Sequence, residues 1–415
     1  MKFDIPFLKK KAYENAANDA EYTMVAKCES ASAEQAEKLA AEAAEESEKL
    51  DELRENAEER MQAASEQEPA KESACETCHP EFDNIAEFRH VCIDYPLKKY
   101  TIRAVTDISL DIRRGKITAL VGESGSGKTT LASSLIRCIS EPGRIAAGEV
   151  IFHSRRDNGE IEDIHIESLN EKDMRKFRWD KVSMVFQAAQ SALNPVMTVR
   201  QQFYETLAAH DAKLTKEQKE ARCRELLDYV KLDVDRVLAS YPHELSGGMK
   251  QRVMIAFSLL LNPELIILDE PTTALDVITQ SYIFNLLRQI NRDMGISMLL
   301  MTHDISVVAK FADYVGVMYG GRLMEYGSVH EVCKHRYHPY TAGLIGATPS
   351  IIGNIEDMHP IEGNPPDLLN LPSGCVFSPR CPFCKEICTQ SEPETREMPD
   401  GSKGKCHFYR EAEHE

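Results

Sequence analysis

A glycine-rich stretch at residues 122–129, with the pattern G-x-x-x-x-G-K-T, constrains this chain more than any other feature. An apolar, strand-like stretch precedes it at 117–121, and a helix-like stretch follows it at 130–139. Glycines let the backbone curl so that N–H groups point at phosphate oxygens, so this strand–loop–helix context predicts a phosphate-binding loop. Lys128 is expected to reach the β- and γ-phosphates, and the Thr129 hydroxyl to ligate Mg²⁺. The residues expected to contact a nucleotide here are Gly122, Ser124, Gly125, Ser126, Gly127, Lys128, Thr129 and Thr130.

Charge and hydropathy argue against several classes of function. The net charge of −18 argues against a nucleic-acid partner, which would require a basic face. No apolar run approaches the roughly 18–20 residues needed to span a bilayer. The N-terminal lysines lead into Ala/Glu-rich sequence rather than into the apolar core of a signal peptide. We therefore expect a cytosolic chain, and if it acts at a membrane, other polypeptides supply the spans.

Residues 1–85 predict an acidic extension that is helical or disordered. Residues 1–80 carry 20 acidic and 10 basic side chains, and the sparse apolar positions hold no sustained heptad. A partner-docking arm is the alternative. Residues Cys75 to His79 match the C-x-x-C-H spacing of haem attachment. A metal site and ordinary linker cysteines remain alternatives for this motif.

Folded sequence is expected from residue 86 onward. Alternating apolar and polar residues at 89–95 and 102–112 predict strands of a half-exposed antiparallel sheet. Tyr100 lies between them and is a candidate for stacking on adenine, with simple packing at a strand edge as the alternative.

A helical subdomain is expected at about 188–250. It follows a short apolar strand at 182–186 that delivers Gln187 at its carboxyl end, where parallel α/β sheets bind ligands. Near its end, one serine and two glycines precede the apolar helix 253–261. Serine and glycines at the start of a helix form a second backbone surface that can bind phosphate. One nucleotide needs only one such loop, so the second is expected to serve a nucleotide held by another subunit. These three residues are Ser246, Gly247 and Gly248.

Two further apolar strands end in chemically active residues. The strand at 265–268 ends in Asp269 and Glu270. Asp269 is placed to hold Mg²⁺ through water, and Glu270 to orient and deprotonate an attacking water. The strand at 297–301 leads to His303, for which a γ-phosphate contact is expected, although a lone histidine is usually structural.

This ordered set of motifs resembles the ATP-binding subunit of ABC transporters. The matching motifs are Walker A (Gly122–Thr129), the Q-loop (Gln187), the signature (Leu245–Gln251), Walker B (Ile266–Asp269, then Glu270), the D-loop (Ala274–Asp276) and the switch histidine (His303). The resemblance implies an α/β P-loop NTPase fold with a mixed sheet core, an antiparallel β subdomain and an inserted helical subdomain. The ATPase domain is expected at 86–335.

The oligopeptide/dipeptide/nickel importer branch is the closer resemblance. It rests on the segments Ser191–Val199, Tyr241–Met249, Asp269–Val277, His338–Thr341 and Gly363–Leu369. It covers residues from about 86 to 415, with 336–415 as the importer-family tail. The residues after Gln187, Ala188-Ala189, depart from the Gln-Asp-Pro common in that branch.

The resemblance implies a head-to-tail pair of ATPase subunits, identical or not, at the cytoplasmic face of the membrane. ATP would lie between Walker A of one subunit and the signature of the other, where Gln251 belongs to the binding surface and Asp276 helps to set the attacking water. The partners implied are two membrane permease subunits and an extracytoplasmic substrate-binding protein, and the cargo implied is peptides. Alternatives are a nickel or other small-solute importer, a soluble ABC ATPase acting on nucleic acid or ribosomes, and a redox-sensing regulator.

The last 41 residues contain five cysteines, a clustering that indicates metal or cluster ligation rather than a disulfide scaffold. Members of the importer branch carry a comparable four-cysteine tail, some with a [4Fe-4S] cluster. Matching that pattern leaves Cys384 as an extra thiol. Structural zinc that uses the Cys381–Cys384 pair is one alternative, and free or disulfide-bonded thiols are another. The ligands implied by the resemblance are Cys375, Cys381, Cys388 and Cys406.

Overall fold

The structure is a computed structural model that describes residues 84–156, 158–187, 192–210, 213–273, 275–347, 361–398 and 400–408. The Cys75–His79 motif and nearly all of the predicted acidic extension lie outside these residues. Their structures and roles therefore remain predictions.

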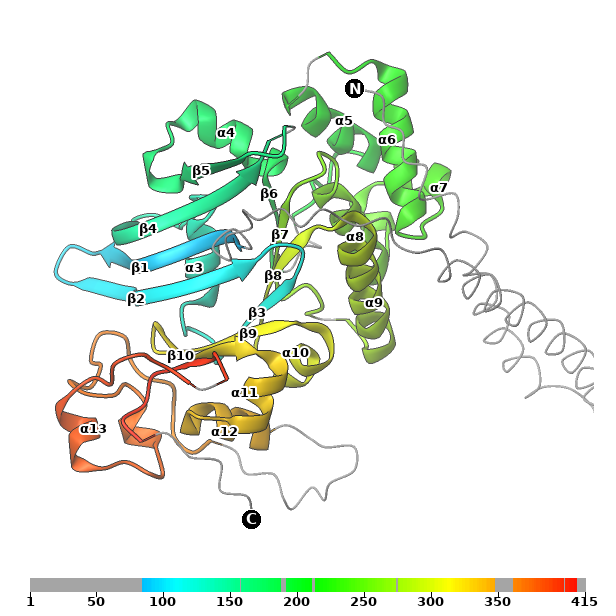
Figure 1. The fold of residues 1–415 in the computed structure, drawn as a ribbon. Coiled ribbons are helices and arrows are strands. Elements are labelled where there is room, and N and C mark those ends of the chain that lie inside the picture. Colours follow the sequence, from blue (N-terminus) through cyan, green and yellow to red (C-terminus); the bar gives the residue numbers. More distant parts are fainter. Residues whose placement is uncertain are drawn as a thin grey trace, which may run out of the picture. The chain divides into compact units, whose positions relative to one another are not determined.

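A four-stranded antiparallel sheet forms the first layer, in the order β2-β1-β4-β5 (Figure 1). The two alternating segments predicted at 89–95 and 102–112 fall within β1 and β2, which confirms the antiparallel β subdomain. Apolar side chains from one face of this sheet enter the main core, as alternation in a one-sided sheet requires. The strands are β1 (Asn84–Pro96), β2 (Thr101–Arg113), β4 (Arg144–Arg155) and β5 (Ile161–His165).

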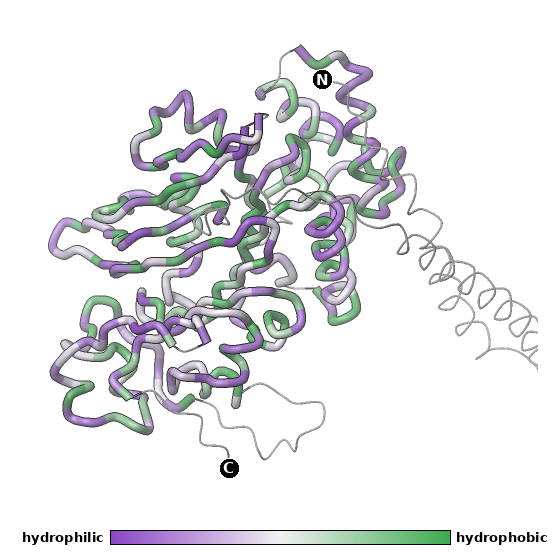
Figure 2. The backbone as a smooth tube through the Cα atoms, viewed as in Figure 1, coloured by the Kyte–Doolittle hydropathy of each residue, from purple (hydrophilic) through white to green (hydrophobic). Residues whose placement is uncertain are grey.

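An eight-stranded mixed sheet forms the second layer, in the order β11-β12-β10-β9-β3-β8-β7-β6. Strands β9, β3, β8, β7 and β6 run parallel, whereas β10, β12 and β11 pair antiparallel. Every residue of β3, β7 and β8 is buried, as expected for parallel strands covered on both faces. Figure 2 shows these central strands in hydrophobic colours. The bounds are β3 (Ile117–Val121), β6 (Val182–Val185), β7 (Leu265–Asp269), β8 (Ser297–Thr302), β9 (Tyr314–Tyr319), β10 (Arg322–Ser328), β11 (Arg396–Glu397) and β12 (Lys403–Gly404).

Helices cluster between β6 and β7 in the chain, as the predicted helical insertion requires. The apolar helix expected at 253–261 is longer toward its start, because Ser246 caps it and Gly247 and Gly248 form its first turn. The helices of this part are α5 (Val199–His210), α6 (Lys216–Tyr229), α7 (Val234–Ala239), the 3₁₀ helix η4 (Pro242–Glu244) and α8 (Gly247–Ser258).

The remaining helices connect strands of the two sheets. The helix-like stretch expected at 130–139 is shorter than its pattern, because α3 ends at Ser134. No described helix is long and apolar enough to cross a membrane. These helices are α3 (Lys128–Ser134), η2 (Ile166–Ser168), α4 (Glu171–Asp180), α9 (Val277–Met294), α10 (Ile305–Phe311), α11 (Val329–His335) and α12 (Pro339–Gly346).

The C-terminal segment, residues 361–398 and 400–408, packs beside β10, α11 and α12 (Figure 1). It contains little regular structure: η6 (Ser378–Arg380), α13 (Glu386–Gln390) and the two short strands β11 and β12. Strand β12 pairs with β10, with Gly404 opposite Glu325, so the end of the chain extends the main sheet. The segment is therefore joined to the ATPase core by backbone hydrogen bonds.

Candidate functional site

The phosphate loop turns tightly between β3 and α3. Gly122 has φ 153°, and a Cβ added there would lie 2.1 Å from the Met318 carbonyl oxygen. Gly127 has φ 97°, and its Cβ would lie 2.6 Å from the Ala104 carbonyl oxygen. Neither position has room for a side chain, so the loop lies directly against β2 and β9.

Lys128 folds back over the inside of this loop. Its Nζ donates to the carbonyl oxygens of Gly122 at 2.7 Å and Glu123 at 2.9 Å, and to Ser126 Oγ at 3.2 Å. Burial lowers the pKa of Lys128, while the charges of Glu270 and Asp269 act in the opposite direction. The ammonium group thus lies at the centre of the loop, held by acceptors that an anion would replace.

An oxygen pair suited to Mg²⁺ lies next to the loop. Thr129 Oγ1 donates to Asp269 Oδ1 at 3.1 Å, which joins the start of α3 to the end of β7. Burial raises the pKa of Asp269, and the Thr129 hydrogen bond partly offsets this shift. Hydroxyl and carboxylate oxygens are ligands that Mg²⁺ prefers, so the donor set fits this ion.

Three neighbouring strand ends converge on Glu270. Gln187 Nε2 donates to Glu270 Oε2 at 2.9 Å, and His303 Nδ1 lies 3.1 Å from Glu270 Oε1. The three residues follow β6, β7 and β8, which are adjacent and parallel, so their carboxyl ends meet at one edge of the sheet. The structure therefore brings together three residues that the sequence places 33 and 83 positions apart.

A third side-chain contact to Glu270 was not expected from the sequence. Thr273 Oγ1 donates to Glu270 Oε2 at 3.0 Å, and the Glu270 backbone adopts φ 45°. Burial alone would raise the pKa of Glu270, but the hydrogen bonds with His303 and Thr273 outweigh it and hold the pKa below its usual value. Glu270 is thus ionised and precisely oriented by its neighbours.

The second predicted phosphate-binding surface lies at the start of α8. Ser246 is exposed and caps α8 by accepting from Met249 N at 3.3 Å. Across the described residues, no hydrogen bond joins Ser246–Gly248 to Gly122–Thr129. Gln251 is buried in α8, so its contact with a nucleotide remains a prediction.

Two other predicted residues lie at the surface. Asp276 caps α9 by accepting from Thr279 N at 2.9 Å and Thr279 Oγ1 at 2.7 Å, and it makes no described contact with Glu270. The next two side chains, Val277 and Ile278, are 80% and 83% exposed. Tyr100 is half exposed just before β2, and its stacking on adenine stays a prediction.

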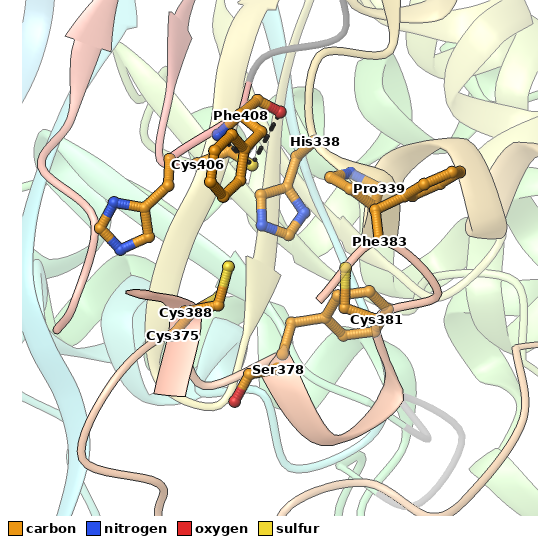
Figure 3. A pocket seen from close by; sticks show the side chains of 11 residues that line it. His338, Pro339, Cys375, Ser378, Cys381, Phe383, Cys388, Cys406 and Phe408 are labelled. Carbon is orange, nitrogen blue, oxygen red and sulfur yellow. Dashed lines mark hydrogen bonds between the residues drawn. The ribbon is translucent and has the colours of Figure 1, made fainter. Parts of the chain in front are cut away.

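Four of the five C-terminal cysteines line one pocket with His338, Phe377 and Phe383 (Figure 3). Burial raises the pKa of the Cys375 thiol to about 11, and it also raises the pKa values of Cys381 and Cys406. All described cysteines are free thiols. Among the described residues, two groups of three or more possible metal ligands have their ligand atoms within 4.8 Å of one another, and neither contains a cysteine: Glu149, His165, Glu167, and Glu331, His335, Asp400. The pocket-lining thiols are Cys375, Cys381, Cys388 and Cys406.

The fold and the strand-end site define an ATPase of the ABC transporter class. Residues 105–273 match the ABC transporter family, and residues 324–388 match the C-terminal region of oligopeptide/dipeptide transporters. The ATPase cassette MJ0796, solved as a dimer in a post-hydrolysis state with ADP and Pi, has a similar fold. It has a TM-score of 0.51 and 29% identity, over 59% of this chain and 98% of that chain.

Curated relatives indicate to which family of ABC transporter ATP-binding proteins the chain belongs. The dipeptide transport ATP-binding protein DppD of Caldanaerobacter subterraneus subsp. tengcongensis is 42% identical over 317 residues, 76% of this chain and 94% of the relative. The oligopeptide transport ATP-binding protein OppD of Escherichia coli K12 is 43% identical over 293 residues, 70% of this chain and 84% of the relative. The chain belongs to the oligopeptide/dipeptide family of ABC transporter ATP-binding proteins.

Proposed function

We propose that this chain hydrolyses ATP to power the import of oligopeptides or dipeptides through two separate permease subunits. Peptides are proposed as the cargo because residues 324–388 match the C-terminal region of oligopeptide/dipeptide transporters. The ATPase core does not indicate the cargo, because it is common to ABC proteins of many functions. The names of the relatives support the same cargo over nickel, and over a soluble ATPase. The chain would act peripherally at the cytoplasmic face of the membrane, with a substrate-binding protein on the other side.

The nucleotide would lie between two ATPase subunits. Lys128 and the loop amides would hold its phosphates, and Thr129, Asp269 and Gln187 would hold Mg²⁺, which neutralises phosphate charge when bound. Ser246, Gly247 and Gly248 of the second subunit would cover the other side. The exposure of Val277 and Ile278 beside Asp276 supports this pairing.

Glu270 would orient and deprotonate the attacking water. Its lowered pKa supports a carboxylate that is ionised before the reaction. His303 would contact the γ-phosphate, and Asp276 of the opposite subunit would help to position the water. Gln187 hydrogen-bonds Glu270. It would therefore couple nucleotide binding and hydrolysis at this site to movement of the helical subdomain, and through it to the permease. Catalysis here is positioning and electrostatic stabilisation, as in phosphoryl transfer generally.

The four pocket-lining cysteines would hold a [4Fe-4S] cluster. A zinc ion needs sulfurs roughly 3.8 Å apart, because tetrahedral Zn–S bonds are about 2.3 Å long. Among the described residues, no three cysteine sulfurs lie within 4.8 Å of one another, whereas a cluster holds each thiolate on a different iron atom. Anaerobically purified chain should therefore contain iron and acid-labile sulfide. Cys388→Ser should lose both and Cys384→Ser should keep them; colourless protein with stoichiometric zinc would refute the cluster.

A mild-detergent pull-down of this chain from its native membrane tests the assembly. We expect two multi-span proteins, a related or identical ATPase and a peptide-binding protein to co-purify. Recovery of ribosomal or nucleic-acid proteins without a membrane partner would overturn the proposal.

A further inference from the structure

The C-terminal segment reaches into the phosphate loop through one arginine. Arg380 Nη1 donates to Glu123 Oε2 at 2.8 Å, and Arg380 Nη2 donates to Glu123 Oε1 at 3.0 Å. The two residues are 257 positions apart in the chain. Their side chains are only 7% and 23% exposed, so this is a largely buried, bidentate ion pair rather than a surface one.

The guanidinium group of Arg380 makes further hydrogen bonds besides those to Glu123. Its Nε donates to the Glu362 carbonyl oxygen at 2.8 Å, and Nη2 also donates to the Ile361 carbonyl oxygen at 3.2 Å. Nη1 also donates to the Tyr319 hydroxyl at 3.2 Å, and the guanidinium carbon lies 5.7 Å from the centre of the Tyr319 ring. An arginine so constrained presents its charge to Glu123 in one geometry.

Tyr340 of α12 makes a second contact with the same loop residue. Its hydroxyl oxygen accepts from Glu123 N at 3.0 Å. The ring is fully buried, with its centre 4.6 Å from that of Tyr319 and 5.3 Å from that of Phe377. Because Phe377 and Arg380 both lie between Cys375 and Cys381, one short stretch of the C-terminal segment supports both contacts.

Glu123 is therefore joined to three groups at once. Its amide donates to Tyr340, its carboxylate accepts from Arg380, and its carbonyl oxygen accepts from Lys128 Nζ at 2.9 Å. Lys128 is the residue expected to reach the phosphates. Without Arg380, the loop would present an uncompensated carboxylate to a polyanionic ligand, at a partly buried position where charges are weakly screened.

We propose that Arg380 and Tyr340 are positioning residues for the phosphate loop: Arg380 neutralises Glu123, Tyr340 fixes its backbone, and together they set the affinity for ATP from the C-terminal segment. This inference rests on ATP binding at Gly122–Thr129, as proposed above. Neither residue is among those expected to contact the nucleotide, and both act on the loop through Glu123.

Calorimetric titration of the full chain with ATP and Mg²⁺ tests this proposal. Arg380→Gln should raise the Kd for ATP roughly tenfold, because it leaves Glu123 unpaired. Arg380→Lys, which keeps the charge, should stay within about threefold of the unmodified chain. The double variant Glu123→Gln/Arg380→Gln should bind more tightly than Arg380→Gln alone, because no carboxylate then remains unpaired.

Arg322→Gln is the matched control. Arg322 makes an equally bidentate pair with Glu392 of the C-terminal segment, at 2.6 and 3.1 Å, but it does not contact the phosphate loop. Its variant should leave the Kd for ATP within about twofold, even where the melting temperature falls as it does in Arg380→Gln. A purely structural role for Arg380 would instead make the two variants behave alike.

Two results of these titrations would contradict the role proposed for Arg380. Unchanged ATP affinity in Arg380→Gln, or a double variant no tighter than Arg380→Gln, would overturn the proposal. If Arg380→Gln does not fold, Tyr340→Phe is tested instead. This variant removes one hydroxyl and should raise the Kd for ATP roughly threefold. An unchanged Kd for ATP in Tyr340→Phe would overturn the proposal. If the unmodified chain binds no ATP, the proposed function fails instead.

Discussion

Thr129 Oγ1 lies 3.1 Å from Asp269 Oδ1, although 140 positions separate the two residues in the chain. This contact joins the phosphate loop to the end of β7, and it pairs a hydroxyl and a carboxylate oxygen of the kind that Mg²⁺ prefers. The cation site and the phosphate site therefore form together when β3 and β7 take their places on either side of β8.

Asp269→Asn should uncouple ATP binding from Mg²⁺. Asparagine keeps the size of the side chain and an oxygen that accepts from Thr129, but it lacks the charge that holds a divalent cation. We expect Mg²⁺ to tighten ATP binding by the unmodified chain and to have roughly tenfold less effect on the variant. Titrations with ATP in Mg²⁺ and in EDTA measure this difference. Equal Mg²⁺ dependence in both proteins would argue against the assignment.

Glu270→Gln should bind ATP but hydrolyse it at least about a hundredfold more slowly, because glutamine cannot accept a proton from water. Phosphate release by the assembled transporter gives the rate, and ATP titration gives the binding. Thr273→Val is a useful companion, because it removes one hydrogen bond to Glu270 and should reduce the rate less. Unchanged turnover in Glu270→Gln would refute the role of the carboxylate.

Ser246→Asp should slow hydrolysis by roughly a hundredfold through charge. Aspartate caps a helix as well as serine does, so α8 should remain intact, while the new carboxylate repels the phosphates bound by the partner subunit. Ser246→Asn is the control, because it caps the helix without a charge and should retain much more activity. If both variants lose activity equally, the effect is not electrostatic and the surface does not face phosphate.

The stability of the chain should depend on pH through Glu325. This carboxylate is buried, with Oε1 accepting from Tyr337 N at 3.1 Å and Oε2 from His338 N at 3.0 Å. Burial raises its pKa from 4.5 to about 7. Between these pH values, the folded chain therefore holds a proton on Glu325 that the unfolded chain has released. The contribution of Glu325 to the free energy of unfolding falls as pH rises through this window, by at most about 1.4 kcal/mol per pH unit.

Denaturant unfolding at several pH values from 4.5 to 7.5 measures this slope. The Glu325→Gln variant cannot titrate at this position, so its free energy of unfolding should change less steeply over the same window. It should also be less stable at low pH, because its amide turns a donor toward a backbone N–H. An equally steep slope in the variant would show that other groups cause the pH dependence.

Much of the nucleotide site could be predicted from the sequence. Gln187, Glu270 and His303 each follow a short apolar strand, and parallel strands must end at one edge of a sheet. Their convergence therefore needed only the strand order, which the family resemblance supplied. Thr273 was missed because threonine three residues after a glutamate is common in turns, and only the left-handed backbone at Glu270 directs its hydroxyl to the carboxylate.

The class of protein could be read from local sequence patterns, because phosphate binding depends on local backbone geometry. Glycine spacing, a strand before the loop and a helix after it specify that geometry within about a dozen residues. The antiparallel subdomain and the helical insertion were predictable for a similar reason, since their periodicities are local.

The contact between the C-terminal segment and the ATPase core became visible only in the folded chain. Glu123 occupies an unspecified position of the loop motif, and Arg380 lies among the cysteines 257 positions later, so no local pattern links them. Their pairing depends on β10 pairing with β12 and on the aromatic contacts of Tyr319, Tyr340 and Phe377. Contacts of this kind follow from the packing of whole elements, which periodicity and spacing do not encode.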